Sequence, residues 1–236
     1  TLSRLIEKYP KFKEISNAYQ MRARAYNEVG LRTLSVKDYQ TIITKYPDLP
    51  LVNSAYLALG NFAEEEKKYE EAIRFYKRAS RTREEPEYPY SLFKLAWNYY
   101  NLSQINYAFK YVRKYLSFYN RKIEKQRKNG KKKEFISARV LRDDMLLDAV
   151  LFYFSGFERK NPRYNIEQSL TYFKDLARGY DNGPAYGRML IRFTKLLRSH
   201  GHERALANWK NRVMALESKR PETLDVLILV YEDQTN

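Results

Sequence analysis

The sequence predicts an all-α fold of stacked helical hairpins, and three observations lead to this prediction. A small residue, then an aromatic or aliphatic residue four positions later, then an apolar residue three positions further on, recur along the chain. In the first three copies the small residues are Ser35, Ala72 and Ala108, which lie 37 and 36 positions apart. Only eight glycines and eight prolines occur in 236 residues, whereas a β-sandwich or barrel needs many tight turns.

Each copy of this pattern describes the buried face of a helix, because positions 0, +4 and +7 fall on one side of a helix. A second small residue lies twelve positions before each of the first three, at Ala23, Gly60 and Ala96. Prolines near the unit ends stop the second helix, since proline lacks the N–H and clashes with the preceding turn. These prolines are Pro10, Pro47, Pro86 and Pro221. Each hairpin keeps an apolar face that only a neighbour can cover, so the units must stack.

The pattern resembles the tetratricopeptide repeat (TPR), whose first helix has an aromatic residue, Leu-Gly and Tyr, and whose second helix has Ala, an aromatic residue and a closing Pro. The best copy reads Tyr56, Leu59, Gly60, Ala72, Tyr76 and Ala79, and the next reads Leu92, Leu95, Ala96, Tyr99 and Ala108. The resemblance implies a TPR-like α-solenoid superhelix of about five helical hairpins, in which the first helices line a concave surface.

The repeats are placed along the chain in order. Within a regular region, 1–120, we expect a partial repeat at 1–10 and repeats at 13–47, 50–86 and 88–120. A basic insertion at 121–136 separates the third repeat from the fourth. The divergent region, 137–236, holds repeats at 137–180 and 184–220 and a partial repeat at 222–236. Both ends fall inside the pattern, so we expect the sequence to be a piece of a longer chain.

Two segments, 90–102 and 141–153, resemble TPR proteins of the bacterial cell envelope, including those of gliding-motility systems. This resemblance implies a periplasmic or cell-envelope location, with the cytoplasm as the alternative. The longest apolar stretch, Leu146 to Phe154, has about nine residues, and a membrane helix needs about 20. No transmembrane segment is therefore predicted.

An aromatic stripe on the third repeat is the favoured surface for a protein or peptide partner. Tyr90, Phe93, Trp97 and Tyr100 share one helix face, opposite the packing signature. Such side chains bury much area at little entropy cost. The full set of groove candidates is Arg24, Asn27, Asn61, Tyr90, Phe93, Trp97 and Tyr100. The alternative is that Phe93 and Trp97 pack between neighbouring first helices, so groove and core both remain open.

Nearly half of the net charge of +16 lies in residues 121–133, which hold eight basic residues and one acid. The candidates for binding a polyanion are Arg121, Lys122, Arg127, Lys128, Lys131, Lys132 and Lys133. One interpretation is contact with nucleic acid, anionic lipid or an acidic protein, and the other is a solvated insertion. Asn129 and Gly130 predict a helix end or turn inside the segment. The remaining charge is scattered and no RNA-binding motif is present, which disfavours nucleic acid.

No catalytic, metal or cofactor site is predicted. The chain has no cysteine, and its two histidines, His200 and His202, flank a glycine in a predicted turn with no third ligand nearby in sequence.

The acidic residues Asp143, Asp144 and Asp148 lie near Arg139 and Arg142, and we interpret them as a surface salt-bridge network rather than as a catalytic pair.

The expected function is therefore a non-catalytic protein-interaction scaffold of the TPR type in a bacterial envelope assembly. The alternative is a basic helical-repeat protein that binds RNA or another polyanion.

Overall fold

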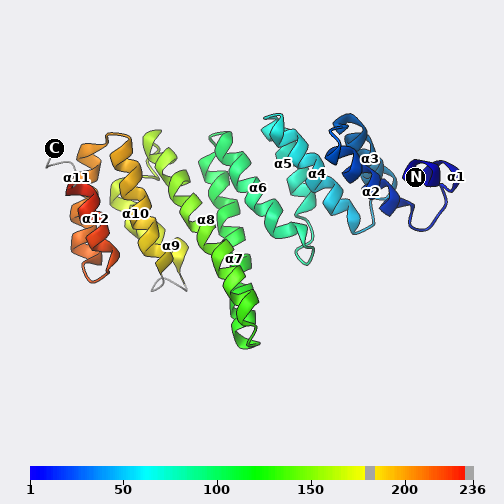
Figure 1. Cartoon of the computed structure of the whole chain (residues 1–236). Helices are drawn as coiled ribbons and strands as arrows, with labels where there is room; N and C mark the ends of the chain where they lie inside the picture. Colours follow the sequence, from blue (N-terminus) through cyan, green and yellow to red (C-terminus); the bar gives the residue numbers. More distant parts are fainter. Residues whose placement is uncertain (179–183, 232–236) are drawn as a thin grey trace. The chain divides into compact units, whose positions relative to one another are not determined.

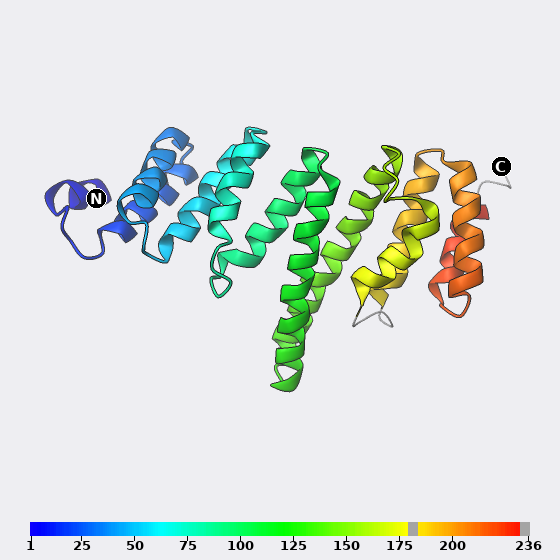
Figure 2. The ribbon, with the colours of Figure 1, turned by 180° about the vertical axis from the view of Figure 1, so that it is seen from behind.

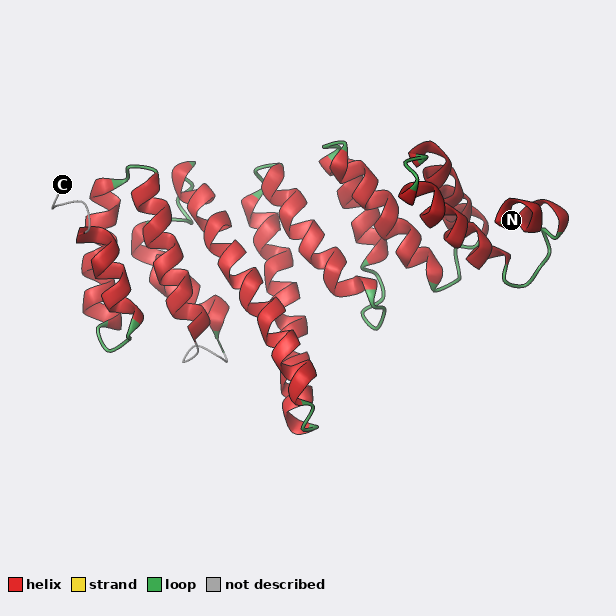
Figure 3. Ribbon diagram, in the orientation of Figure 1, coloured by secondary structure: helices red, strands yellow, loops and turns green. Residues whose placement is uncertain are grey.

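The computed structural model of the chain describes residues 1–178 and 184–231, which form α-helices joined by turns, with no strand among them (Figures 1 and 3). The predicted all-α fold is confirmed. Two predicted repeats extend beyond the described residues, 137–180 by residues 179–180 and 222–236 by residues 232–236. The chain divides into two compact units, Thr1–Ser103 and Gln104–Asn236.

The first unit contains six helices among its described residues, and each packs on the next. They are α1 (Leu2–Lys8), α2 (Ile15–Glu28), α3 (Arg32–Lys45), α4 (Leu51–Glu65), α5 (Tyr69–Ala79) and α6 (Glu87–Asn101). In addition, α4 contacts α6, so the first helices of successive hairpins lie side by side.

The second unit repeats this arrangement over its described residues (Figure 2). Its helices are α7 (Ile105–Lys128), α8 (Lys132–Glu158), α9 (Ile166–Ala177), α10 (Pro184–Ser199), α11 (Glu203–Glu217) and α12 (Glu222–Tyr231). The first helices α8, α10 and α12 contact one another in turn, and the second helices α9 and α11 also touch. This alternation is the stacking that the TPR resemblance implies.

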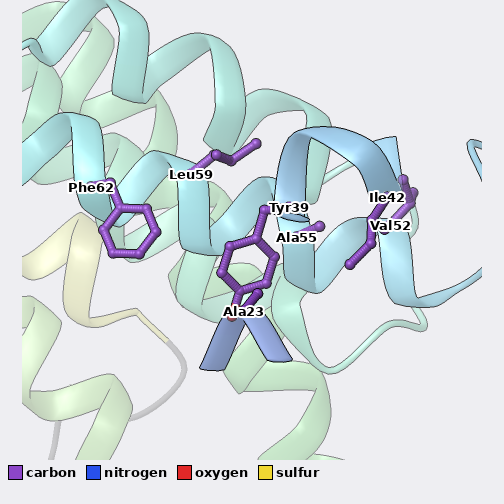
Figure 4. Packing of buried hydrophobic residues seen from close by; sticks show 7 residues of the cluster. All are labelled: Ala23, Tyr39, Ile42, Val52, Ala55, Leu59 and Phe62. Carbon is purple, nitrogen blue, oxygen red and sulfur yellow. The ribbon is translucent and has the colours of Figure 1, made fainter. Parts of the chain in front are cut away.

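The small residues of the repeat pattern lie where two helix backbones approach each other. Ser35 is fully buried, and its hydroxyl donates a hydrogen bond of 2.7 Å to the carbonyl of Ala23 on the partner helix. A Cβ on Gly60 would lie 2.6 Å from the ring of Tyr76, so only glycine fits there. The helices α2, α3 and α4 share a buried hydrophobic cluster (Figure 4). Its residues are Ala23, Tyr39, Ile42, Val52, Ala55, Leu59 and Phe62.

Among the described residues, several turns between consecutive helices contain a residue with positive φ. These residues are Gly30, Lys67, Ser103, Gly130, Lys160 and Gly201. In most of them the following N–H reaches back to a carbonyl five residues earlier, as from Leu31 to Tyr26 at 2.8 Å. This backbone closure satisfies the free carbonyls at the helix end. Because it uses main-chain atoms, this closure also forms after Lys67 and Lys160, although glycine is the usual residue at such a position.

A buried ion-pair cluster joins α7, α8, α9 and α10 in the second unit. The guanidinium of Arg142, 1% exposed, contacts Asp143 at 2.9 Å, Asn120 at 2.6 Å and the carbonyl of Ala177 at 2.9 Å. The Asp143 carboxylate also forms an ion pair of 3.3 Å with Arg188. The interpretation of this charge cluster as a surface network is wrong for Arg142 and Asp143, since both are buried between four helices.

The basic segment 121–136 is helical on both sides of one short turn. α7 and α8 have 24 and 27 residues, against 12, 16 and 15 for α9, α10 and α11. The α7–α8 hairpin therefore extends beyond the other helices of its unit (Figure 1). Asn129 caps α7 and Gly130 has a φ of +66°, so the helix end predicted at this pair is confirmed.

Candidate functional site

The aromatic stripe forms a continuous row of rings along α6. Tyr90 stacks on Phe93 with ring centroids 6.2 Å apart, and Phe93 meets Trp97 at 6.4 Å. Trp97 then meets Tyr100 edge to face at 5.5 Å. These four rings are named the α6 ladder. Contacts of this kind hold each ring in place before any ligand arrives.

The opposite face of α6 carries the packing residues, whereas no residue of the ladder is fully buried. Leu92, Leu95, Ala96 and Tyr99 are all buried. On the ladder face Tyr90 is 44% exposed, and Phe93, Trp97 and Tyr100 are half-buried. The ladder is therefore partly covered and partly accessible.

A polar network from α4 and α5 meets the N-terminal end of the ladder. The hydroxyl of Tyr76 lies 2.9 Å from the Asn61 side-chain oxygen and 2.6 Å from the Glu64 carboxylate. Lys94 donates to the same carboxylate at 2.7 Å, and its ammonium lies 5.5 Å from the Tyr90 ring centroid. The network thus connects Asn61, one groove candidate, with Tyr90, another.

Burial and Glu64 together shift the pKa values of Tyr76 and Lys94. Burial, followed by the hydrogen bond to Glu64, raises the pKa of Tyr76 and keeps its hydroxyl a donor. Burial lowers the pKa of Lys94, but the hydrogen bond and charge of Glu64 outweigh it, so the pKa is raised overall. Lys94 therefore carries a fixed positive charge beside the ladder.

Two predicted groove residues lie apart from this network. Arg24 and Asn27 are exposed on α2. Burial raises the pKa of Tyr39 on α3, and the positive charge of Arg24 partly offsets that rise. The link between α2 and α4 comes instead from Gln20, which donates to the hydroxyl of Ser54.

The polyanion candidates lie at the far end of the α7–α8 hairpin, and every one of them is exposed. Glu124 pairs with Arg127 at 3.1 Å and with Lys128 at 3.6 Å. Lys131, Lys132 and Lys133 have no side-chain hydrogen bond or ion pair within residues 1–178 and 184–231.

A basic pocket between α7 and α9 was not predicted. Phe109, Tyr164 and Tyr172 line a cavity of about 310 Å³, and Lys110, Arg113 and Arg163 lie around them. Asn106, Phe109, Lys110 and Arg113 occupy one face of α7, and that spacing could have marked a polar–aromatic stripe.

The rest of the pocket depends on the chain between α8 and α9, which brings Tyr164 to Asn106 at 2.8 Å. A side chain at Gly156 would prevent this, because its Cβ would lie 2.4 Å from the Tyr164 ring. No local sequence rule places these residues together.

The two histidines pack against aromatic rings. His200 and His202 lie 4.8 Å and 5.7 Å from the Phe154 ring, and His202 also approaches Glu158 at 3.4 Å. Within the described part of the chain, no three His, Asp or Glu side chains are grouped to hold a metal ion. In the same residues, no helix has the length and apolar character needed to cross a membrane.

Comparison with known proteins supports the fold. The sequence matches no protein-family model, and no curated protein matches it. Among solved structures, PilF of Pseudomonas aeruginosa superposes with a TM-score of 0.50 at 18% identity, over 96% of this chain and 86% of that one. PilW, described as a widely conserved type IV pilus biogenesis factor, gives a TM-score of 0.44 at 12% identity, over 96% and 87%. PilF is a TPR protein, so the likeness shows that this chain has a TPR-like helical-repeat fold.

Proposed function

We propose that this protein is a non-catalytic interaction scaffold that binds an extended peptide or partner element along the α6 ladder. The observation that carries the proposal is the row of four touching, partly accessible rings on the face of α6 that points away from the buried packing residues. Tyrosine and tryptophan dominate binding energies at protein interfaces, because they are large, rigid and amphipathic.

The neighbouring polar network gives the surface directional contacts. Lys94, whose ammonium lies 5.5 Å from the Tyr90 ring centroid, and Asn61 are the polar groups of this network beside the rings. Because Glu64 and Tyr76 already hold these groups, a ligand does not have to order them, which favours affinity. The chemistry suits a peptide with an apolar or aromatic anchor.

A displayed library of random peptides tests this proposal. Peptides selected on the intact chain are measured against Trp97→Ala and Tyr90→Ala by calorimetry. Loss of an anchor ring costs an interface more than about 1.4 kcal/mol, so we expect at least a tenfold weaker Kd for each variant.

Tyr9→Ala is the matched control, since Tyr9 is a 61% exposed tyrosine at the end of α1 in the same unit, outside the ladder. Circular dichroism and thermal melting confirm that each variant is folded. Selected peptides that bind both ladder variants as tightly as the wild type would refute the ladder as the binding surface.

The bacterial envelope is the proposed setting of this scaffold. The resemblance of residues 90–102 and 141–153 to envelope repeat proteins supports it. Fractionation of cells that express the natural gene tests it, and recovery of the protein in the cytoplasm alone would contradict it.

A second candidate function is polyanion binding at the tip of the α7–α8 hairpin. Its support is the exposure of all seven basic candidates on two adjoining helix ends. Binding of a polyanion releases counterions, so affinity for heparin or RNA should fall steeply with salt. A flat salt dependence would contradict this candidate.

A further inference from the structure

The end of the α7–α8 hairpin combines positive charge with exposed aliphatic side chains. We define the hairpin tip as residues 121–140, which include the end of α7, the turn at Gly130 and the start of α8. Its basic residues number nine, since Lys125 and Arg139 join the seven candidates, while its acids are Glu124 and Glu134. A cluster of this density attracts anionic surfaces within a Debye length of about 8–10 Å.

The aliphatic residues of the tip lie on the same side of α8 as its lysines. Ile136 is 50% exposed and Val140 is 52% exposed. Lys132, Ile136 and Val140 follow one another at intervals of four, so they form one stripe along the helix. Lysine and aliphatic side chains can therefore meet the same flat partner together.

The tip is firmly attached to its unit. Ile123 and Ala138 close the seam between α7 and α8, and both are buried. Just behind them the Arg142 guanidinium bonds to Asn120 at 2.6 Å and so connects the two helices. The hairpin therefore presents the tip as a braced projection.

We propose that the hairpin tip docks on an anionic lipid surface, with its lysines among the headgroups and Ile136 and Val140 at the edge of the acyl region. This proposal rests on the second candidate function, polyanion binding, and names the polyanion. A phosphodiester chain would satisfy the lysines alone, whereas a bilayer also takes up the aliphatic stripe.

Flotation with vesicles tests the charge requirement. The whole chain is mixed with vesicles of phosphatidylcholine alone or of phosphatidylcholine with phosphatidylglycerol, and binding is expected only to the second. The variant Lys131→Gln/Lys132→Gln/Lys133→Gln should lower the partition coefficient roughly a hundredfold, at about fivefold per lysine.

The matched control removes three positive charges elsewhere in the second unit, in Lys195→Gln/Arg204→Gln/Lys219→Gln. These residues are exposed and make no side-chain ion pair within the described residues. The control should bind as the wild type does. Equal losses in the two triple variants would overturn the proposal, because net charge alone would then explain the binding.

The aliphatic requirement has its own variant. Ile136→Ser/Val140→Ser should lower vesicle binding roughly tenfold, since it removes buried apolar area at the lipid surface, and should leave heparin binding unchanged. Leu216→Ser/Leu224→Ser is the control, because these leucines are each 62% exposed outside the tip. Vesicle binding that is insensitive to Ile136 and Val140 would contradict insertion.

The depth of the hairpin tip in the bilayer is measured with a fluorophore on a single introduced cysteine, since the chain has no cysteine of its own. Val140→Cys and Lys195→Cys each provide a single site for an environment-sensitive fluorophore. The label at residue 140 should shift to the blue on anionic vesicles, and the label at residue 195 should not. A label at residue 140 that stays in water while the protein floats would overturn the lipid assignment.

RNA or heparin binding separates the two proposals. If the lysine variant loses heparin binding but the wild type never floats with anionic vesicles, polyanion binding stands and lipid docking fails. If the wild type binds neither heparin nor vesicles, both fail together.

Discussion

At the scale of single residues, close packing at Gly60 shows why the repeat pattern has small residues at fixed points. The ring of Tyr76 fills the space where a side chain would project, and hydrogen bonds to Asn61 and Glu64 hold its hydroxyl. These small positions could be predicted, since the 36–37 residue period displays them three times. The hydroxyl network could not, because it joins residues from α4, α5 and α6.

We therefore expect Gly60→Ala to destabilise the first unit by about 1–3 kcal/mol, because the added methyl group has no room beside a ring that cannot turn away. Urea unfolding followed by circular dichroism measures this loss. Gln40→Ala is the reference variant, since Gln40 is exposed within α3 and its replacement should cost less than about 0.5 kcal/mol. A Gly60→Ala protein as stable as the wild type would show that the ring is not fixed.

The burial of Arg142 could not be predicted from the sequence. An Arg-Asp-Asp run on a helix has the composition of a surface, and only the packing of α8 between α7, α9 and α10 buries it. Such burial depends on contacts with residues up to 45 positions away, such as Arg188 with Asp143. No local periodicity contains that information.

Replacing Arg142 by leucine should cost about 3–5 kcal/mol, because it leaves the Asp143 carboxylate buried with fewer partners. Thermal unfolding detects this as a marked drop in Tm. Arg139→Leu is the control: its guanidinium is 38% exposed and 3.9 Å from Asp143, so its loss should cost less than about 1 kcal/mol. Similar losses in both variants would show that burial does not determine the cost.

At the scale of elements, the spacing of small and aromatic residues predicts the helical hairpins, but it does not predict where each helix ends. Proline marks some ends, whereas Lys67, Ser103 and Lys160 end turns with positive φ. A lysine or serine gives no sequence signal for that conformation. At Lys67 and Lys160 the stabilising bond joins only main-chain atoms, from the following N–H to a carbonyl five residues earlier. The candidate ladder was predictable as a stripe on one helix, while the basic pocket needed the chain between α8 and α9.

Residues 124–133, the outermost part of the hairpin tip beyond the buried Ile123 and Ala138, are expected to open more readily than the rest of α7 and α8. Residues 124–133 contain no buried side chain, whereas segments 108–116 and 145–154 contain many. Amide hydrogen exchange should therefore be at least about tenfold faster in 124–133, since local opening there exposes little apolar area. The other two segments serve as internal controls. Equal protection along both helices would indicate a contact that covers the tip.

At the scale of the whole molecule, the many tyrosines with raised pKa values should make the folded chain less stable at alkaline pH. Burial is the largest cause that raises the pKa of Tyr39, Tyr46, Tyr76, Tyr115, Tyr119, Tyr153, Tyr164, Tyr172 and Tyr186 above 10.0. Each stays neutral in the folded chain where it would ionise in the unfolded one. The unfolded state then binds fewer protons, so stability is complete below pH 10 and falls as pH rises further.

Urea unfolding midpoints should accordingly be constant up to about pH 9 and fall steeply above about pH 10. Lys94 adds to this decline, since Glu64 raises its pKa as well. The variant Tyr115→Phe removes one buried hydroxyl and should make the fall of the unfolding midpoint above pH 10 less steep. A midpoint that rises between pH 10 and pH 11 would contradict the sign of these shifts.

The division into two units was not foreseen, since the repeat pattern runs through residues 103 and 104 without a break. The sequence shows which positions repeat, but the strength of packing between successive hairpins depends on side chains from both. What the pattern did supply is the α6 face on which the proposed scaffold function depends.

Quenching of Trp97 fluorescence by acrylamide tests that function most directly. The chain has two tryptophans, and Trp209 is 0% exposed, so Trp97 supplies the quenchable signal. A peptide selected on the intact chain should reduce quenching to near the level of Trp209 as it saturates the ladder. Saturating binding with unchanged quenching would contradict the claim that α6 receives the partner.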